Sequence, residues 1–173
     1  MCGIVGAVGH KQCSDVLLGA LKRLEYRGYD SSGIVTVHDS AIVLQRAVGK
    51  LVNLDLALKE TPLLGDIGIG HTRWATHGGV STENAHPHVA SGRVAIVHNG
   101  IIENHRIIRV RLEAAGHQFS SDTDSEVLAH LFVEAFDAGL DPAMATRQVL
   151  DEIDGAYAFA VMAIDHPDLL IVA

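Results

Sequence analysis

The chain alternates short apolar runs with stretches in which apolar residues recur every three or four positions. Apolar runs rich in β-branched residues predict buried strands, and the three-to-four spacing predicts amphipathic helices. Strands are expected at residues 2–9, 33–37, 41–48, 67–74, 93–98, 156–164 and 169–173. Helices are expected at residues 14–25, 51–61, 104–115, 123–138 and 142–153.

The segment between residues 75 and 91 lacks periodicity and contains two glycines and a proline. It predicts a long loop, and loops of this length in compact domains are usually functional. No linker, low-complexity stretch or internal repeat interrupts the chain, so a single domain containing both helices and strands is expected. The pattern alone does not choose between a parallel sheet and stacked antiparallel sheets.

Composition narrows the class of protein. The 173 residues are 48% hydrophobic and 20% charged, which suits one well-buried domain. The formal charge of −8 and the lack of a Lys/Arg run argue against nucleic acid, whose binding depends on cation–phosphate attraction. No signal peptide and no apolar stretch long enough to cross a membrane is evident, so we expect a cytoplasmic protein without a membrane partner.

The first cysteine is the strongest candidate for chemistry. Removal of Met1 would place a thiol and a free α-amine together on Cys2. An α-amine titrates near ~7.7–8.0, so at neutral pH it is partly unprotonated and can accept the thiol proton while sulfur attacks a carbonyl carbon. The competing interpretation is that Cys2 only begins a buried strand. Cys13, the other cysteine, is expected at a helix start or in the core.

Six of the eleven histidines lie between residues 71 and 105, which raises the question of a metal site. The candidate ligands are His71, His77, His86, His88 and His98. Neither a H-E-x-x-H nor a C-x-x-C motif accompanies them, and only one carboxylate lies in the loop beside them. We therefore expect neither a metal nor another cofactor.

An Asn-Gly pair follows the strand expected to end at His98. Asn99 and Gly100 there suit an oxyanion hole, formed by a side-chain amide and by a glycine N–H that a ligand can approach closely. Asn-Gly is also a common turn dipeptide, so a plain turn is the alternative. Three further residues also have ordinary interpretations: Arg73 as a surface charge, Trp74 as core, and Asp124 as an acid at a helix start.

Six segments together resemble the glutaminase domains of the glutamine–fructose-6-phosphate aminotransferase family. They cover the start of the chain, the Tyr-Arg-Gly-Tyr-Asp and His-Thr-Arg-Trp-Ala-Thr-His motifs, and three shorter motifs: 1–6, 25–31, 70–78, 84–88, 98–104 and 123–126. The resemblance spans almost the whole chain. It implies an α+β N-terminal-nucleophile hydrolase fold, a four-layer αββα sandwich, with the chain incomplete at its C-terminus.

The resemblance also implies roles for individual residues. Cys2 would attack the side-chain amide of L-glutamine to form a thioester, and Asn99 with the Gly100 N–H would stabilise the oxyanion. Arg73 would hold the substrate α-carboxylate and Asp124 its α-ammonium.

Four more residues resemble pocket or lid positions of the family. Thr76, His77 and His86 would line the pocket or its lid, and Trp74 resembles a gating tryptophan.

By the same resemblance, residues 1–173 form a type 2 glutamine amidotransferase domain whose ammonia converts fructose 6-phosphate to glucosamine 6-phosphate. The sugar isomerase domain that binds fructose 6-phosphate lies outside this chain, and the full-length protein is expected to be a homo-oligomer. Two alternatives stay open: another glutamine-dependent amidotransferase, and a catalytically silent glutamine-binding regulatory domain.

Overall fold

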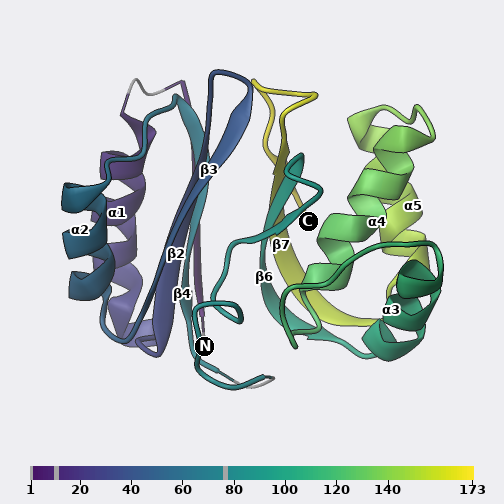
Figure 1. Cartoon of the computed structure of the whole chain (residues 1–173), viewed down its shortest axis with the longest axis horizontal. Coiled ribbons are helices and arrows are strands. Elements are labelled where there is room, and N and C mark those ends of the chain that lie inside the picture. Colours follow the sequence, from purple (N-terminus) through teal and green to yellow (C-terminus); the bar gives the residue numbers. More distant parts are fainter. Residues whose placement is uncertain (1, 10–11, 76–77) are drawn as a thin grey trace.

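The computed structural model describes residues 2–9, 12–75 and 78–173. It forms two four-stranded sheets packed face to face between two groups of helices (Figure 1). The strands are β1 (Gly3–Val8), β2 (Ser31–His38), β3 (Ala41–Val48), β4 (Ile67–Arg73), β5 (His88–Ala90), β6 (Val94–Ile102), β7 (Gly155–Ala163) and β8 (Ile171–Val172). The α-helices are α1 (Cys13–Leu24), α2 (Leu51–Glu60), α3 (His105–Ala114), α4 (Glu126–Asp137) and α5 (Pro142–Glu152), and a 3₁₀ turn, η1, spans Glu25–Arg27.

The first sheet has the strand order β1-β4-β2-β3, and every pairing in it is antiparallel. Helices α1 and α2 cover its outer face (Figure 1). The apolar stripe of α1, including Leu17 and Leu21, packs there with Ile34 of β2 and Leu54 of α2. Burial of this stripe, rather than a capped start, holds α1 in place, because its N-cap residue makes no side-chain capping bond.

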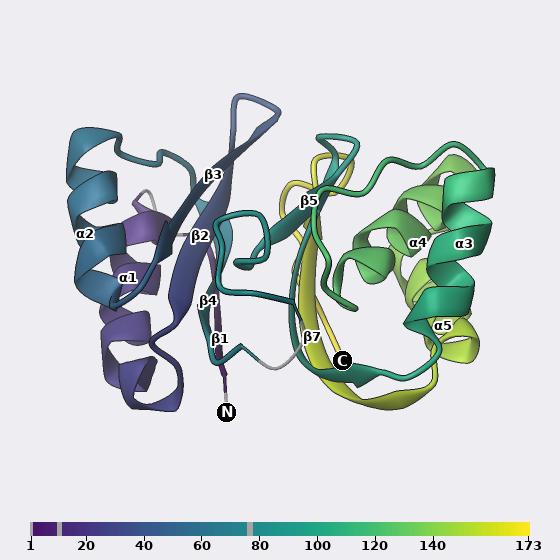
Figure 2. The same ribbon diagram turned by 60° about the horizontal axis from the view of Figure 1, so that its bottom comes forward.

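The second sheet has the order β5-β6-β7-β8, again antiparallel throughout. Helices α3, α4 and α5 cover its outer face (Figure 2). Helix α4 is buried along almost its whole length and supplies Phe132 to a core that also contains Ile96 of β6 and Val149 of α5.

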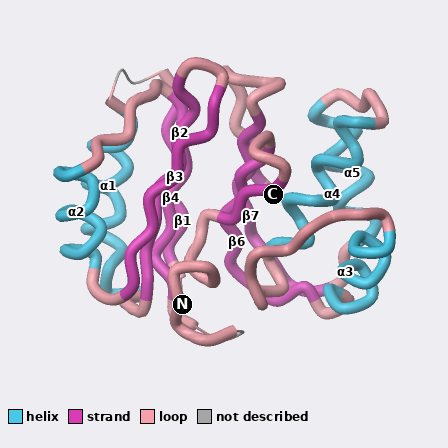
Figure 3. Tube along the Cα trace, viewed as in Figure 1, coloured by secondary structure: helices cyan, strands magenta, loops and turns pink. Residues whose placement is uncertain are grey.

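A third apolar cluster fills the space between the sheets. Val35 of β2 and Ile69 of β4 meet Val97 of β6 and Met162 of β7 there. Neighbouring residues on one strand therefore face different cores: Ile34 faces the helices and Val35 faces the opposite sheet. Figure 3 shows the resulting order of helix, sheet, sheet and helix, which confirms the expected αββα sandwich.

The antiparallel pairing resolves the choice that the sequence pattern left open. The middle of β2 and the first part of β6 are apolar on both faces, because each strand is covered on both faces. Such segments are typical of parallel sheets, whose strands are also covered on both faces. In this molecule the second cover comes from the other sheet instead of a second helix layer.

Two expected boundaries were wrong. β6 does not end at His98 but continues to Ile102, with Asn99 paired to Ala158 and Gly100 to Tyr157 of β7. The turn interpretation of the Asn-Gly pair is therefore wrong. The expected loop after residue 75 also contains the short strand β5, which pairs with the first part of β6.

The helix starts also differ from expectation. The side chain of Asn104 does not cap α3; it donates to the Glu152 carbonyl oxygen at 2.8 Å and accepts from the Asp154 N–H at 3.0 Å. The Thr123–Glu126 segment is not a capping box, since Glu126 turns back to the preceding loop. No helix in the described ranges is both long and apolar enough to cross a membrane.

Candidate active site

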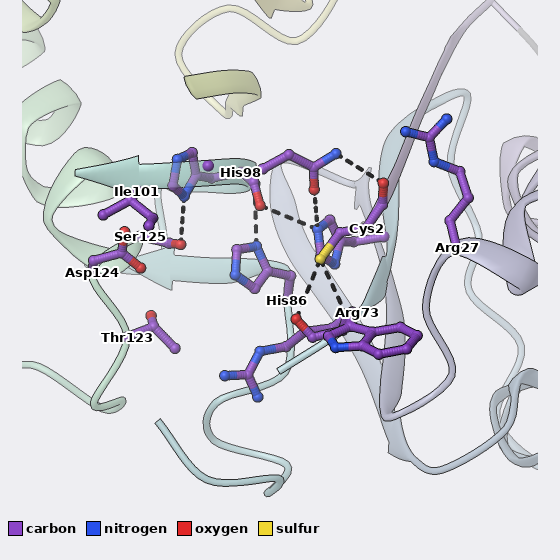
Figure 4. Close-up of a pocket in the computed structure, with 13 residues that line it drawn as sticks. Cys2, Arg27, Arg73, His86, His98, Ile101, Thr123, Asp124 and Ser125 are labelled. Atoms are coloured by element: carbon purple, nitrogen blue, oxygen red, sulfur yellow. Dashed lines mark hydrogen bonds between the residues drawn. The ribbon is translucent and has the colours of Figure 1, made fainter. Parts of the chain in front are cut away.

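The two sheets end in a pocket of about 290 Å³ (Figure 4). Six pieces of chain form it: the residue before β1, η1, the end of β4 with the residue after it, the loop before β5, the second half of β6 and the segment before α4. Its lining consists of Cys2, Arg27, His71, Arg73, Trp74, His86, His98, Asn99, Gly100, Ile101, Thr123, Asp124 and Ser125. The pocket therefore joins most of the residues that the sequence singled out.

Strand alternation explains why polar side chains reach this pocket. Every second residue of a strand faces the same side of its sheet. On β4, Ile67 and Ile69 face the core between the sheets, so His71 and Arg73 continue that row. The apolar core between the sheets thus becomes a polar pocket at one end.

β6 and β1 follow the same rule. Val97 of β6 packs in the core between the sheets, so Asn99, two residues further along, faces the pocket. Ile4 of β1 packs against that core, and Cys2 continues its row. The nucleophile candidate and the amide candidate are therefore brought together from different sheets.

Cys2 lies at the pocket wall beside the end of β4, with its side chain partly exposed. Its sulfur accepts a hydrogen bond from the Trp74 N–H at 3.2 Å, and the thiol lies 3.6 Å from the Trp74 carbonyl oxygen. A backbone N–H directed at sulfur stabilises negative charge on it. Cys2 is therefore an accessible thiol whose sulfur is already held in one place.

The Gly100 N–H faces the pocket, as the hydrogen bonds of β6 indicate. Alternate N–H groups of a strand point to the same side. The His98 N–H donates to His86 Nδ1 at 3.2 Å and the Ile102 N–H donates to Asp124 Oδ2 at 2.8 Å, both away from β7. The Gly100 N–H lies between them on that side, where the pocket begins.

Glycine is required at position 100 for a steric reason. The backbone there has a φ of 132°, a region that side chains rarely adopt. A Cβ atom would also lie 2.1 Å from the Ala156 carbonyl oxygen. A side chain at this position would therefore clash with β7, so the backbone conformation that presents the Gly100 N–H depends on glycine.

Arg73 is a buried cation, which corrects its interpretation as a surface charge. The residue is only 4% exposed. Its guanidinium donates to the carbonyl oxygens of Gly79 at 3.1 Å and Gly78 at 3.3 Å, which fixes its orientation. Burial lowers its pKa below the usual range, while Cys2, Asp30 and Asp124 act in the opposite direction. A guanidinium held this way suits a carboxylate ligand.

Asp124 is equally buried, on the α4 side of the pocket, two residues before the helix begins. One carboxylate oxygen, Oδ2, accepts the Ile102 N–H. Its neighbours hold the segment in place: Thr123 Oγ1 lies 2.9 Å from His88 Nε2, and Ser125 Oγ lies 2.7 Å from His98 Nδ1. The pocket therefore carries a fixed anion as well as a fixed cation.

Histidines form one wall of the pocket and the layer behind it. His71 stacks on His86 with 4.3 Å between ring centroids, and His86 meets His88 edge-on at 4.5 Å. Burial lowers the pKa of His71 to about 4 and that of His88 to about 3, and it also lowers the pKa values of His86 and His98. These imidazoles are neutral at pH 7. His86, expected in the pocket, lines it and supports β6 through the His98 N–H.

Proximity of these histidines does not by itself make a metal centre. Within residues 2–9, 12–75 and 78–173, no group of three His, Cys, Asp or Glu side chains is arranged to hold an ion. His77, one of the candidate ligands, lies outside the described residues, as does Thr76.

Trp74 lies at the pocket opening and not in the core. Its side chain is 44% exposed, and its ring meets the edge of Tyr29 at a centroid distance of 5.4 Å. The core interpretation of Trp74 is therefore wrong.

The sequence had marked His71 and His98 only as candidate metal ligands and had given Arg27 and Ser125 no role, although all four line the pocket. For His71 a signal existed, since it continues the alternating row of Ile67 and Ile69. Ser125 meets His98 only through the packing of α4 on β6.

Comparison with known proteins agrees with this geometry. A family model described as a glutamine amidotransferase domain matches residues 71–173. Glutamine–fructose-6-phosphate aminotransferase (isomerizing) of Zymomonas mobilis is 53% identical over 171 residues, and that of Gluconobacter oxydans is 55% identical over 172. Each alignment covers 99% of this chain and 28% of the relative, so the chain spans about 28% of the length of these proteins.

Solved structures show the same fold. The chain superposes on the glutamine phosphoribosylpyrophosphate amidotransferase of B. subtilis with a TM-score of 0.79 and 26% identity, over 95% of this chain and 35% of that one. A structure described as the allosteric regulatory enzyme of purine biosynthesis gives a TM-score of 0.84 and 28% identity, over 100% and 37%. With most of its length matched by the family model and both sheets shared with these enzymes, the chain belongs to the glutamine amidotransferase domain family.

Proposed function

We propose that the chain hydrolyses L-glutamine to glutamate and ammonia, with Cys2 as the nucleophile. The observation that carries this is the shared pocket: a reactive thiol, a buried guanidinium, a buried carboxylate and two candidate oxyanion donors line one cavity of about 290 Å³. Membership in the glutamine amidotransferase family supports the same substrate.

Substrate selection follows from the two buried charges. Arg73 offers paired N–H donors to an α-carboxylate, and Asp124 offers a carboxylate oxygen to an α-ammonium. An amino acid zwitterion presents a complementary charge to both residues, whereas an amine or an acid alone presents one to only one of them. The side chain of the bound amino acid then extends toward Cys2.

The reaction proceeds in two steps, formation of a thioester and its hydrolysis. Removal of Met1 frees the Cys2 amine, which takes the thiol proton as sulfur bonds to the amide carbon. The Asn99 amide and the Gly100 N–H receive the charge that builds on the amide oxygen. The C–N bond then breaks, the amine returns its proton, and ammonia leaves a glutamyl thioester. Water attacks the thioester, glutamate departs and the thiol is restored.

The relatives are named for aminotransfer to fructose 6-phosphate, and the same use of ammonia is proposed for this protein. The acceptor site, with fructose 6-phosphate as its ligand, would belong to a sugar isomerase domain outside residues 1–173. A gating role between the two sites is proposed for Trp74, which is exposed and lines the pocket. A cytoplasmic location and a homo-oligomeric full-length protein remain predictions from the sequence.

The direct test is replacement of the nucleophile. Cys2→Ala should abolish glutamate production from glutamine, and a form that retains Met1 should be nearly as impaired, because one residue supplies both nucleophile and base. Cys13→Ala, the matched control, should leave turnover intact because Cys13, the first residue of α1, is fully buried in the core. Normal turnover by the Cys2→Ala protein would refute the proposal.

A further inference from the structure

A chain of hydrogen bonds links the two sheets next to Cys2. His71 Nε2, on β4, lies 3.2 Å from the His98 carbonyl oxygen and 2.9 Å from Asn99 Oδ1, both on β6. Asn99 Nδ2 then donates to the Cys2 carbonyl oxygen at 3.2 Å. Figure 4 draws hydrogen bonds between pocket-lining residues as dashed lines, several of them near the labelled Cys2 and His98.

Both ends of this chain of hydrogen bonds are backbone carbonyl oxygens. A carbonyl oxygen can only accept a hydrogen bond, so the donor of every bond between the two ends is determined. His71 Nε2 must carry a hydrogen to bond the His98 oxygen. The atom of Asn99 that faces His71 must then be the amide oxygen, and the amide nitrogen must face Cys2. The orientation of an asparagine amide is ordinarily ambiguous from shape alone, but this network permits only one.

Burial strengthens the assignment. His71 is fully buried, and desolvation lowers its pKa to about 4, so the ring is neutral at pH 7 and carries one hydrogen. That hydrogen is on Nε2, and Nδ1 has no hydrogen-bond partner among the described residues. The stacked ring of His86 restricts the plane of the imidazole.

From this chain of hydrogen bonds we propose that His71 is a positioning residue, which holds the Asn99 amide with its nitrogen toward Cys2. One N–H of that nitrogen is held by the Cys2 carbonyl oxygen, and the second is left to meet the substrate oxyanion. The inference rests on the proposed oxyanion role of Asn99. Without the His71 donor, the Asn99 oxygen would be left without its buried partner, and the amide could turn over.

The test compares two replacements of His71 in Met1-free protein. His71→Phe keeps a ring against His86 but removes the donor, and should lower kcat for glutamine hydrolysis by on the order of 10- to 100-fold with little change in KM. His71→Gln places an amide N–H near the position of Nε2 and should recover most of the loss. A general packing role would not distinguish these two variants in this way.

The matched control is His166→Phe, which removes an imidazole that packs on Phe136 at a centroid distance of 5.2 Å, away from the pocket. The kcat of this variant should stay within about two-fold of the parent, because substitutions away from an active site usually have small effects. If His71→Phe and His71→Gln lose kcat equally, or neither loses any, His71 does not position the amide and the inference is wrong.

A double-mutant cycle separates this inference from the proposed function. Asn99→Ala should lower kcat by roughly 10²–10³, as removal of an oxyanion donor does. His71→Phe combined with Asn99→Ala should then be no slower than Asn99→Ala alone, because the residue acts only through that amide. Full additivity would overturn the inference while leaving Asn99 in place. An unchanged kcat for Asn99→Ala would instead remove the oxyanion role itself.

Discussion

The two cysteines of this chain have opposite environments, although they lie eleven positions apart. Cys2 is partly exposed in the pocket and accepts a backbone N–H at sulfur. Cys13 is fully buried at the start of α1, where burial, with a smaller contribution from Asp66, raises the pKa of its thiol to about 11. Thiolate is the reactive form, so reactivity should be confined to Cys2.

A glutamine-analogue diazo-ketone should therefore alkylate Cys2 and leave Cys13 unmodified in the folded protein at pH 7–8. Peptide mass spectrometry after digestion reports both sites in one experiment. Denatured protein treated with a general thiol reagent serves as the control, because both cysteines should then react. Labelling of Cys13 in the folded protein, with Cys2 untouched, would contradict the assignment of the nucleophile.

The segment that leads into α4 is held in one conformation by a buried carboxylate. Glu126, the first residue of α4, is 1% exposed and accepts from the N–H and hydroxyl groups of both Ser120 and Ser121, at 2.6–2.8 Å. Burial alone would raise its pKa, but the His130 ring 3.9 Å away and the hydrogen bonds from the two serines outweigh it and leave the pKa well below 4.5. The carboxylate holds the turn that carries Asp124.

Replacement of this carboxylate should affect both folding and substrate affinity. Glu126→Gln keeps the shape but removes the charge and half of the accepting capacity, so the free energy of unfolding should fall by about 1–3 kcal/mol. KM for glutamine should rise several-fold while kcat changes less, since Asp124 would lose its fixed position. Glu113→Gln is the control, because Glu113 is half-exposed and pairs with Arg109 at the surface. Wild-type stability and KM in Glu126→Gln would show that the turn is held by other contacts.

At the scale of the whole molecule, packing of the two sheets buries four histidines. Their burial makes the free energy of unfolding depend on pH. Burial lowers the pKa of His71 to about 4 and that of His88 to about 3, from 6.5. The unfolded chain therefore binds protons that the folded chain does not. Stability from these groups is complete above pH 6.5 and is lost as pH falls toward the folded pKa values.

Each such histidine should lower the free energy of unfolding by about 1.4 kcal/mol per pH unit below 6.5. Around His88, Glu126 opposes the shift, while Arg46, His71 and Arg73 favour it. In urea unfolding followed by circular dichroism between pH 6 and 4.5, His88→Gln should have a slope shallower by about that amount. The exposed His38 provides the control variant His38→Gln. A slope unchanged by His88→Gln would mean that this ring is protonated in the folded state.

The sequence by itself determined the elements and most of the candidate site. Apolar periodicity is a local property, so α2 and β3 were predicted within a residue or two of their observed bounds. The resemblance of its motifs to a known family indicates Cys2, Arg73, Asn99 and Asp124 as site residues, and all four line one pocket. Chemistry that depends on residue type, such as a thiol beside an amine, can be inferred from the sequence alone.

Only the tertiary structure decided which faces meet. A strand covered on both sides reads the same whether its second cover is a helix or a sheet, so the apolar run of β6 could not reveal the sandwich. The role of His71 was hidden for a related reason. Its hydrogen bond to Asn99 joins residues 28 positions apart on different sheets. Such a contact depends on long-range packing of the two sheets, which local propensity does not encode.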